Sequence, residues 1–159
     1  MVAADTRALL EFARTDDLAR DDAVGVIGYC MGGRHAVTAA ASFPGQVKAA
    51  ASIHGGRLVS EAADSAHRRL AEMEAEVFFA FADQDAAAPP AHLELIRDEL
   101  RHNGITGKAE LLEGALHGFA FPERYCHHEA VAEYCWSVWL GMLERKLGPL
   151  RDEAGEVMA

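Results

Sequence analysis

The sequence Gly28-Tyr29-Cys30-Met31-Gly32-Gly33 decides the fold of this chain. It ends an apolar run at 24–29 (VGVIGY) that is typical of a buried strand, and it precedes an alanine-rich segment with helical character. Glycines flank Cys30 on both sides, because a side chain at either position would collide with the neighbouring strand or helix in a tight turn. The pattern predicts a strand, a sharp turn and a helix in direct succession.

This turn predicts a nucleophile at its tip. A G-x-S-x-G turn between a strand and a helix lifts its central side chain out of the sheet, and Cys30 occupies that central position here. The N-terminus of the following helix favours a thiolate through its dipole and its free N–H groups. The N–H of Met31 then forms half of an oxyanion hole. A small cysteine buried in a glycine-rich turn is the simpler alternative, and the turn by itself does not separate the two interpretations.

Apolar strands alternate with helical segments along the chain, which predicts an α/β fold with a mostly parallel sheet of about four strands flanked by helices. No internal repeat or long linker interrupts the 159 residues, so we expect one domain over 1–159. Strands are expected at 24–29, 47–53, 77–81 and 108–112, and helices at 4–19, 32–43, within 60–74, from Pro89-Pro90 onward and at 123–147.

Two later loops contain the acid and the base that the nucleophile needs. Asp85 lies in the polar loop that follows the third strand, with Asp83 as the alternative acid, and His117 ends the fourth strand. An isolated aspartate or histidine in a loop usually has a turn or solvent role. Here the order is nucleophile, acid and histidine, and each residue follows a strand. We therefore predict that His117 takes the thiol proton while Asp85 fixes its tautomer.

These segments resemble the dienelactone hydrolase family of the α/β-hydrolase superfamily. The likeness is carried by GYCMGG at 28–33, FADQDAAAP at 81–89 and EGALHGFAFP at 113–122, and it extends over about 21–147. The resemblance implies a hydrolase of small esters or lactones without a cofactor. It also places Cys30, Asp85 and His117 on the family's triad positions.

Three further residues are expected to line the substrate pocket: Tyr29, His54 and Phe119. His54 falls where the family often has an aromatic residue near the pocket, and a polar residue at a strand end is the alternative interpretation.

The likeness also implies a truncated α/β-hydrolase fold. The family's first strands, and the upstream loop that supplies the second oxyanion donor, have no counterpart before the turn. The strand at 24–29 is then expected at a sheet edge, where unpaired backbone groups favour pairing with another chain, and a homodimer follows. A weak or inactive shortened fold that serves as a dimerisation or binding module is the alternative function. A third alternative is a protein whose true start lies further upstream.

Composition narrows the remaining possibilities. The net charge of −10 disfavours nucleic acid and anionic membrane surfaces as partners, and no apolar run is long enough to span a membrane. The first residues do not form a signal peptide, and three cysteines without a framework spacing indicate a cytoplasmic protein with reduced thiols. Cys126 and Cys135 are too far apart on one predicted helix to form a disulfide. His127 and His128 point in diverging directions, so no metal site is expected.

Overall fold

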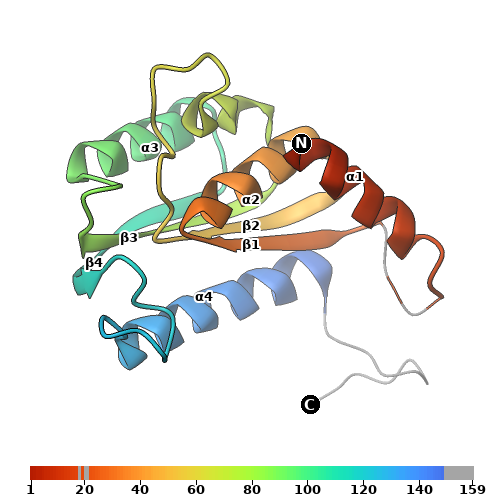
Figure 1. Cartoon of the computed structure of the whole chain (residues 1–159). Helices are drawn as coiled ribbons and strands as arrows, with labels where there is room; N and C mark the ends of the chain where they lie inside the picture. The colour runs from red at the N-terminus through yellow and green to blue at the C-terminus, as the bar shows by residue number, and fades with distance from the viewer. Residues whose placement is uncertain (18, 20–21, 149–159) are drawn as a thin grey trace.

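A parallel sheet of four strands in the order β1-β2-β3-β4 forms the centre of the molecule (Figure 1). The computed structural model describes residues 1–17, 19 and 22–148. The strands are β1 (Val24–Tyr29), β2 (Val47–Ile53), β3 (Glu76–Gln84) and β4 (Gly107–Leu116). They contain all of the predicted strands, so the α/β fold with a parallel sheet of about four strands is confirmed.

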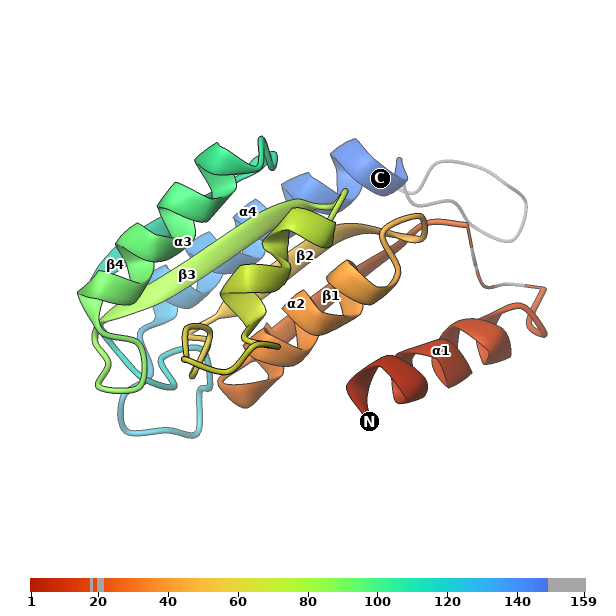
Figure 2. The same cartoon turned by 90° about the horizontal axis from the view of Figure 1, so that it is seen from above.

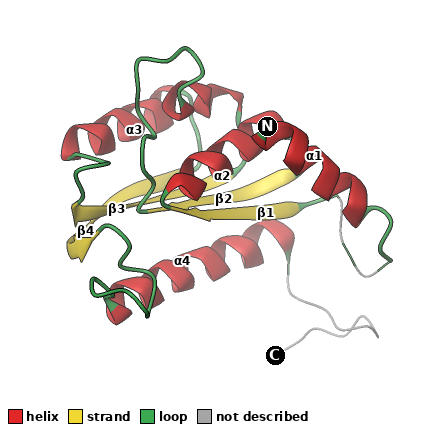
Figure 3. Cartoon of the chain, viewed as in Figure 1, coloured by secondary structure: helices red, strands yellow, loops and turns green. Residues whose placement is uncertain are grey.

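Helices cover both faces of this sheet, as Figures 1 and 2 show. One face carries α1 (Val2–Ala13), α2 (Met31–Ser42), α3 (Pro90–His102) and the short 3-10 helix η1 (Ala66–Glu72), whereas α4 (Glu129–Leu147) lies on the other. The loops after β2, β3 and β4 leave the sheet at the same end of the strands (Figure 3). The carboxyl ends of all four parallel strands lie there, and α/β proteins generally place their ligands at these ends.

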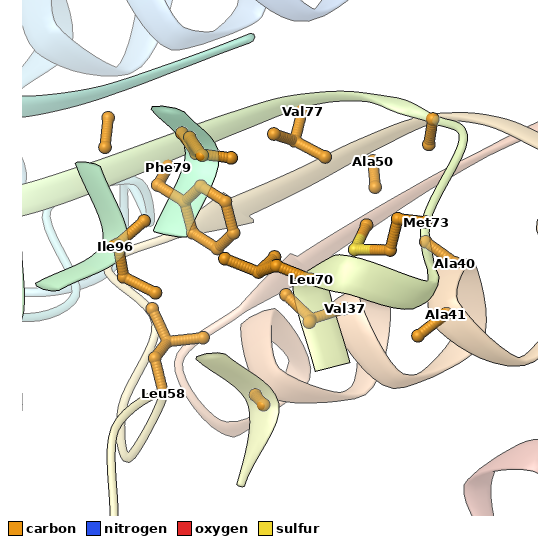
Figure 4. Packing of buried hydrophobic residues seen from close by; sticks show 14 of the residues in the cluster. Val37, Ala40, Ala41, Ala50, Leu58, Leu70, Met73, Val77, Phe79 and Ile96 are labelled. Atoms are coloured by element: carbon orange, nitrogen blue, oxygen red, sulfur yellow. The ribbon is translucent and has the colours of Figure 1, made fainter. Parts of the chain in front are cut away.

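The phenylalanine-rich strand β3 joins the two halves of the core. Successive side chains of a strand point to opposite faces of the sheet. Phe79 therefore packs with Leu70 and Ile96 beneath η1 and α3 (Figure 4), and Phe78 packs with Trp139 on the α4 side. Burial on both faces explains why this strand is apolar throughout its middle. Each buried ring stabilises the fold by about 1.5–3 kcal/mol.

Two helix boundaries lie well away from the predicted ones. The first helix, expected at 4–19, ends at Ala13, because the N–H groups of Thr15 and Asp16 bond to carbonyls three residues earlier and close turns. The last helix, expected from Glu123, begins at Glu129. The imidazole of His128 accepts a backbone N–H of the first turn and caps this helix. Such local hydrogen bonds determine where a helix begins or ends, and they leave little trace in the apolar periodicity.

Strand β1 forms one edge of the sheet, as expected. It pairs with β2 on one side, and no other strand of the described chain pairs with it. Most of its residues are half-buried, whereas nearly all of β2 is buried. The helices α1 and α4 both expose large apolar side chains, among them Leu9 and Phe12 on α1 and Trp136 and Leu140 on α4.

We expect the isolated chain to self-associate, because an unpaired strand edge offers N–H and C=O groups to a second chain. Light scattering coupled to size-exclusion chromatography over a dilution series should show a mass above that of the monomer at high concentration. A monomer mass throughout the series would contradict this expectation.

Candidate active site

The three predicted catalytic residues meet at the carboxyl ends of the parallel strands. Cys30 follows β1, Asp85 follows β3, and His117 follows β4. The Sγ atom of Cys30 lies 3.1 Å from Nε2 of His117, and Nδ1 of His117 lies 2.6 Å from Oδ2 of Asp85. Three strands that run in parallel end at the same edge, which is why residues up to 87 positions apart come into contact. The arrangement is that of a nucleophile, a base and an acid in line.

The backbone at Cys30 is strained. Its φ of 53° and ψ of −121° lie in a region that side-chain-bearing residues avoid, at a cost of about 1–3 kcal/mol. Backbone N–H groups of Gly33 and Gly56 hold this conformation by donating to the Cys30 carbonyl at 3.0 and 3.1 Å. A Cβ atom at Gly28 would lie 1.9 Å from the carbonyl oxygen of Gly32, so the close return of the chain requires glycine. This backbone conformation points the thiol of Cys30 out of the sheet.

Asp85 is buried beside the ring of His117. Its side chain is 1% exposed, and its two oxygens accept hydrogen bonds from His117 Nδ1 and, at 2.8 Å, from the backbone N–H of Ala87. A carboxylate only accepts, so Nδ1 of His117 carries the proton and Nε2 presents its lone pair toward Cys30. Asp83, the alternative acid, is exposed, and its carboxylate accepts from the N–H of Gly114 instead. Of the two aspartates, Asp85 is the one next to the base.

Met31 has the position that an oxyanion donor requires. It is the first residue of α2, and the N–H groups of a first helical turn have no acceptor within the helix. The helix dipole adds partial positive charge at the same point. An oxyanion formed on a carbonyl that Cys30 attacks would lie beside this N–H group.

A cavity of about 230 Å³ opens over the thiol. Two of its side chains are cationic, Arg34 and Arg57, and sequence reasoning missed both. Arg34 lies one helical turn after Cys30, so the spacing of four residues was a usable signal. Arg57 has a φ of 55° in an irregular loop, and no periodicity marks such a position. The lining residues are Cys30, Met31, Arg34, Gly56, Arg57, Ala87 and His117.

A family model described as the dienelactone hydrolase family matches residues 1–147. The chain belongs to the dienelactone hydrolase family. A protein from Synechocystis sp. that is provisionally named carboxymethylenebutenolidase is 28% identical over 138 residues, which are 85% of this chain and 55% of that protein. The chain therefore spans about half the length of this curated relative.

Solved structures of the family have the same fold. A provisionally named dienelactone hydrolase from Klebsiella pneumoniae superimposes with a TM-score of 0.81 at 25% identity, over 89% of this chain and 60% of that one. The dienelactone hydrolase-like promiscuous phosphotriesterase P91 from metagenomic libraries gives a TM-score of 0.76 at 18% identity, over 91% of this chain and 61% of that one. At the lower identity the likeness concerns the fold alone.

Two side chains expected to line the pocket of this family member lie beneath it instead. His54 and Phe119 are both 0% exposed, and their rings pack edge to face with centroids 5.2 Å apart. Tyr29 is half-buried, and its ring packs against that of Phe121, with the ring centroids 5.3 Å apart, rather than over the cavity. Residues adjacent in a strand point to opposite faces, so Tyr29 turns toward the α4 side when Cys30 points to the cavity.

The other two cysteines have structural surroundings. Cys126 and Cys135 are buried free thiols, and Cys126 precedes α4 instead of sharing a helix with Cys135 as predicted. The Sγ atom of Cys126 donates to the carbonyl oxygen of His117 at 3.2 Å and so anchors the segment that carries the base. Burial raises the pKa of Cys135 to about 12, which keeps that thiol protonated. Cys30 is thus the one exposed cysteine of the three.

Two further features are absent from the part of the chain that the structure describes. No group of three or more His, Cys, Asp and Glu side chains there is arranged to hold a metal ion. No helix there is both long and apolar enough to cross a membrane.

Proposed function

We propose that this chain hydrolyses small esters or lactones through a thioester on Cys30. The observation that carries the proposal is the continuous contact from Cys30 Sγ to His117 Nε2 and from His117 Nδ1 to Asp85. A weak nucleophile is activated by a neighbouring base that a third group orients. Here the thiol is exposed, His117 is the base, and the buried carboxylate of Asp85 orients it.

The proposed reaction has two halves. His117 removes the thiol proton, and the thiolate attacks the substrate carbonyl to form a tetrahedral oxyanion beside the N–H of Met31. The carbon–oxygen bond to the alcohol breaks, the alcohol takes the proton from His117, and a thioester remains on Cys30. Water then loses a proton to His117 and attacks the thioester. The acid leaves, and the proton returns to the thiol.

The pocket favours a substrate that carries negative charge. Arg34 and Arg57 both line the cavity over Cys30, and arginine binds carboxylates through two parallel N–H donors. The name of the Synechocystis relative refers to a butenolide with a carboxymethylene group, which is an anionic lactone when its carboxyl group is ionised. We propose the same chemical class for this chain. The free thiols favour a reducing compartment, and we propose the cytoplasm.

A catalytically weak module for dimerisation or binding is the second candidate. The unpaired edge of β1 among the described residues favours it. Met31 is the one oxyanion donor that we assign, and loss of one of two such donors lowers kcat by roughly 10²–10³-fold. A complete triad is therefore compatible with low turnover.

The decisive experiment compares the chain with its Cys30→Ala variant on p-nitrophenyl acetate. We expect turnover by the wild type, none by the variant, and one acetyl group on Cys30 in the intact mass of the quenched wild type. Thermal melting of both proteins controls for folding. If neither folded protein turns over the ester or is acetylated, the binding module becomes the better interpretation.

A further inference from the structure

His54 lies beside Cys30 because of the register between two strands. Strands β1 and β2 are parallel, with Tyr29 opposite Ile53, so the next residue of each strand comes to the same edge. The backbone N–H of His54 donates to the carbonyl of Ala80 at 2.8 Å, which ties this point to β3. The φ of His54 is 39°, a left-handed value at which histidine is more common than most residues.

The imidazole of His54 contacts both the nucleophile and the base. The backbone N–H of Cys30 is shared between the carbonyl of Ile53 at 3.1 Å and Nδ1 of His54 at 3.2 Å. The rings of His54 and His117 meet edge to face, with centroids 4.9 Å apart and planes 62° apart. Since Nδ1 accepts, the proton of the neutral ring is on Nε2.

Apart from the hydrogen bond from Cys30, the buried surroundings of His54 do not explain why a polar residue stands there. Its side chain is fully buried, and Nε2 has no hydrogen-bond partner among the described residues. The neighbouring rings of Phe119 and Phe121 are apolar, with centroids 5.2 and 5.8 Å away. An unpaired buried donor lowers stability, and a phenylalanine would fill the same space without one. Burial, together with His117, lowers the pKa of His54 to about 4, so the ring stays neutral at neutral pH.

We propose that His54 is a positioning residue of the candidate active site. Its Nδ1 atom helps to hold the Cys30 backbone in the elbow conformation, and its ring sets the plane of the His117 imidazole. Together these contacts keep Cys30 Sγ within hydrogen-bond distance of His117 Nε2. Small displacements of reacting groups have large effects on rate, so a residue that never touches substrate can control the reaction. The turnover part of this inference rests on the proposed function, whereas thiol reactivity does not.

Two substitutions separate the two contacts. His54→Asn places an amide oxygen near the present position of Nδ1, tolerates a positive φ, and removes the ring. His54→Phe keeps the ring and removes the acceptor. His54→Gln, whose amide lies one bond further from the backbone, replaces His54→Phe if that variant does not fold. Phe119→Leu is the matched packing control. Phe119 belongs to the buried cluster on the α4 side and packs edge to face against His54, but its side chain has no group that can hydrogen-bond to Cys30.

The first readout is the rate of Cys30 alkylation by iodoacetamide as a function of pH, with the modified cysteine located by peptide mass spectrometry. The second is kcat and KM for p-nitrophenyl acetate, and thermal melting monitors folding. We expect His54→Phe to lower alkylation at neutral pH and kcat by about ten- to hundredfold at constant KM. We expect His54→Asn to recover part of this loss, because it restores the acceptor for the Cys30 N–H but not the ring beside His117. We expect Phe119→Leu to lower the melting temperature alone.

Equal alkylation rates and kcat in all folded variants would overturn the proposal. So would an equal loss in Phe119→Leu, because a general packing effect would then suffice. If the wild type is alkylated readily at Cys30 but turns over no ester, the proposed function fails. The alkylation rates of the variants still decide the role of His54 in that case.

Discussion

Asp85→Asn is expected to lower kcat for ester hydrolysis by about 10³–10⁴-fold while the protein stays folded. The carboxylate is buried and accepts from His117 Nδ1 at 2.6 Å and from the N–H of Ala87 at 2.8 Å. An asparagine amide can occupy the same space, but its NH₂ group toward the ring favours the tautomer that carries its proton on Nε2. His117 then cannot accept the thiol proton. Steady-state kinetics on p-nitrophenyl acetate, with thermal melting of both proteins, measures the effect.

Asp83→Asn is the matched control for this substitution. It makes the same chemical change two residues earlier, on an exposed carboxylate that accepts from the backbone N–H of Gly114. We expect kcat close to that of the wild type. If Asp83→Asn reduced kcat as strongly as Asp85→Asn, both carboxylates would be needed for His117 to act as the base. A large loss in Asp83→Asn alone would assign the catalytic carboxylate to Asp83.

Gly28→Ala is expected to lower the free energy of unfolding by about 3 kcal/mol or more. The added Cβ atom would lie 1.9 Å from the carbonyl oxygen of Gly32 and 2.8 Å from the backbone nitrogen of Gly33. Both neighbours are backbone atoms at the start of α2, so no side chain can rotate away to make room. The start of the helix would have to move from β1, and Cys30 would move with it. Urea denaturation followed by circular dichroism measures the loss.

Gly32→Ala is the control within the same turn. A Cβ atom at Gly32 has nothing within 4 Å, and the residue lies inside α2. Alanine is the better helix former, so stability should be unchanged or higher by up to about 1 kcal/mol. A Gly28→Ala variant as stable as Gly32→Ala would mean that β1 and α2 do not approach each other this closely.

The edge position of the elbow strand connects the fold to the level of activity. Strand β1 carries Cys30 at its end and has β2 as its one neighbour among the described residues. Residues that precede the elbow in a fold of this kind would supply a second oxyanion donor. Low turnover with readily alkylated Cys30 would therefore indicate an assembled triad that lacks this donor. High turnover would indicate that a group of this chain, or of a second copy, serves in its place.

Much of the candidate site could be predicted from the sequence, because its residues are marked by local patterns. The glycines around Cys30 have a steric cause within six residues of chain, and apolar runs mark the strands that precede Asp85 and His117. Parallel strands bring their carboxyl ends to one edge, so chain order sufficed to propose which residues meet. The local pattern does not separate Asp83 from Asp85, because both lie in the same polar segment.

The sequence alone determined the strands, the elbow turn and the order of nucleophile, acid and base, because each depends on contacts or periodicities within a short stretch of chain. The tertiary structure alone decided that His54 and Phe119 lie beneath the pocket and that Arg34 and Arg57 line it. A strand-end residue can turn toward the cavity or the core, and neighbours from distant segments decide which. For His54 those neighbours are Cys30 and His117, which follow two different strands.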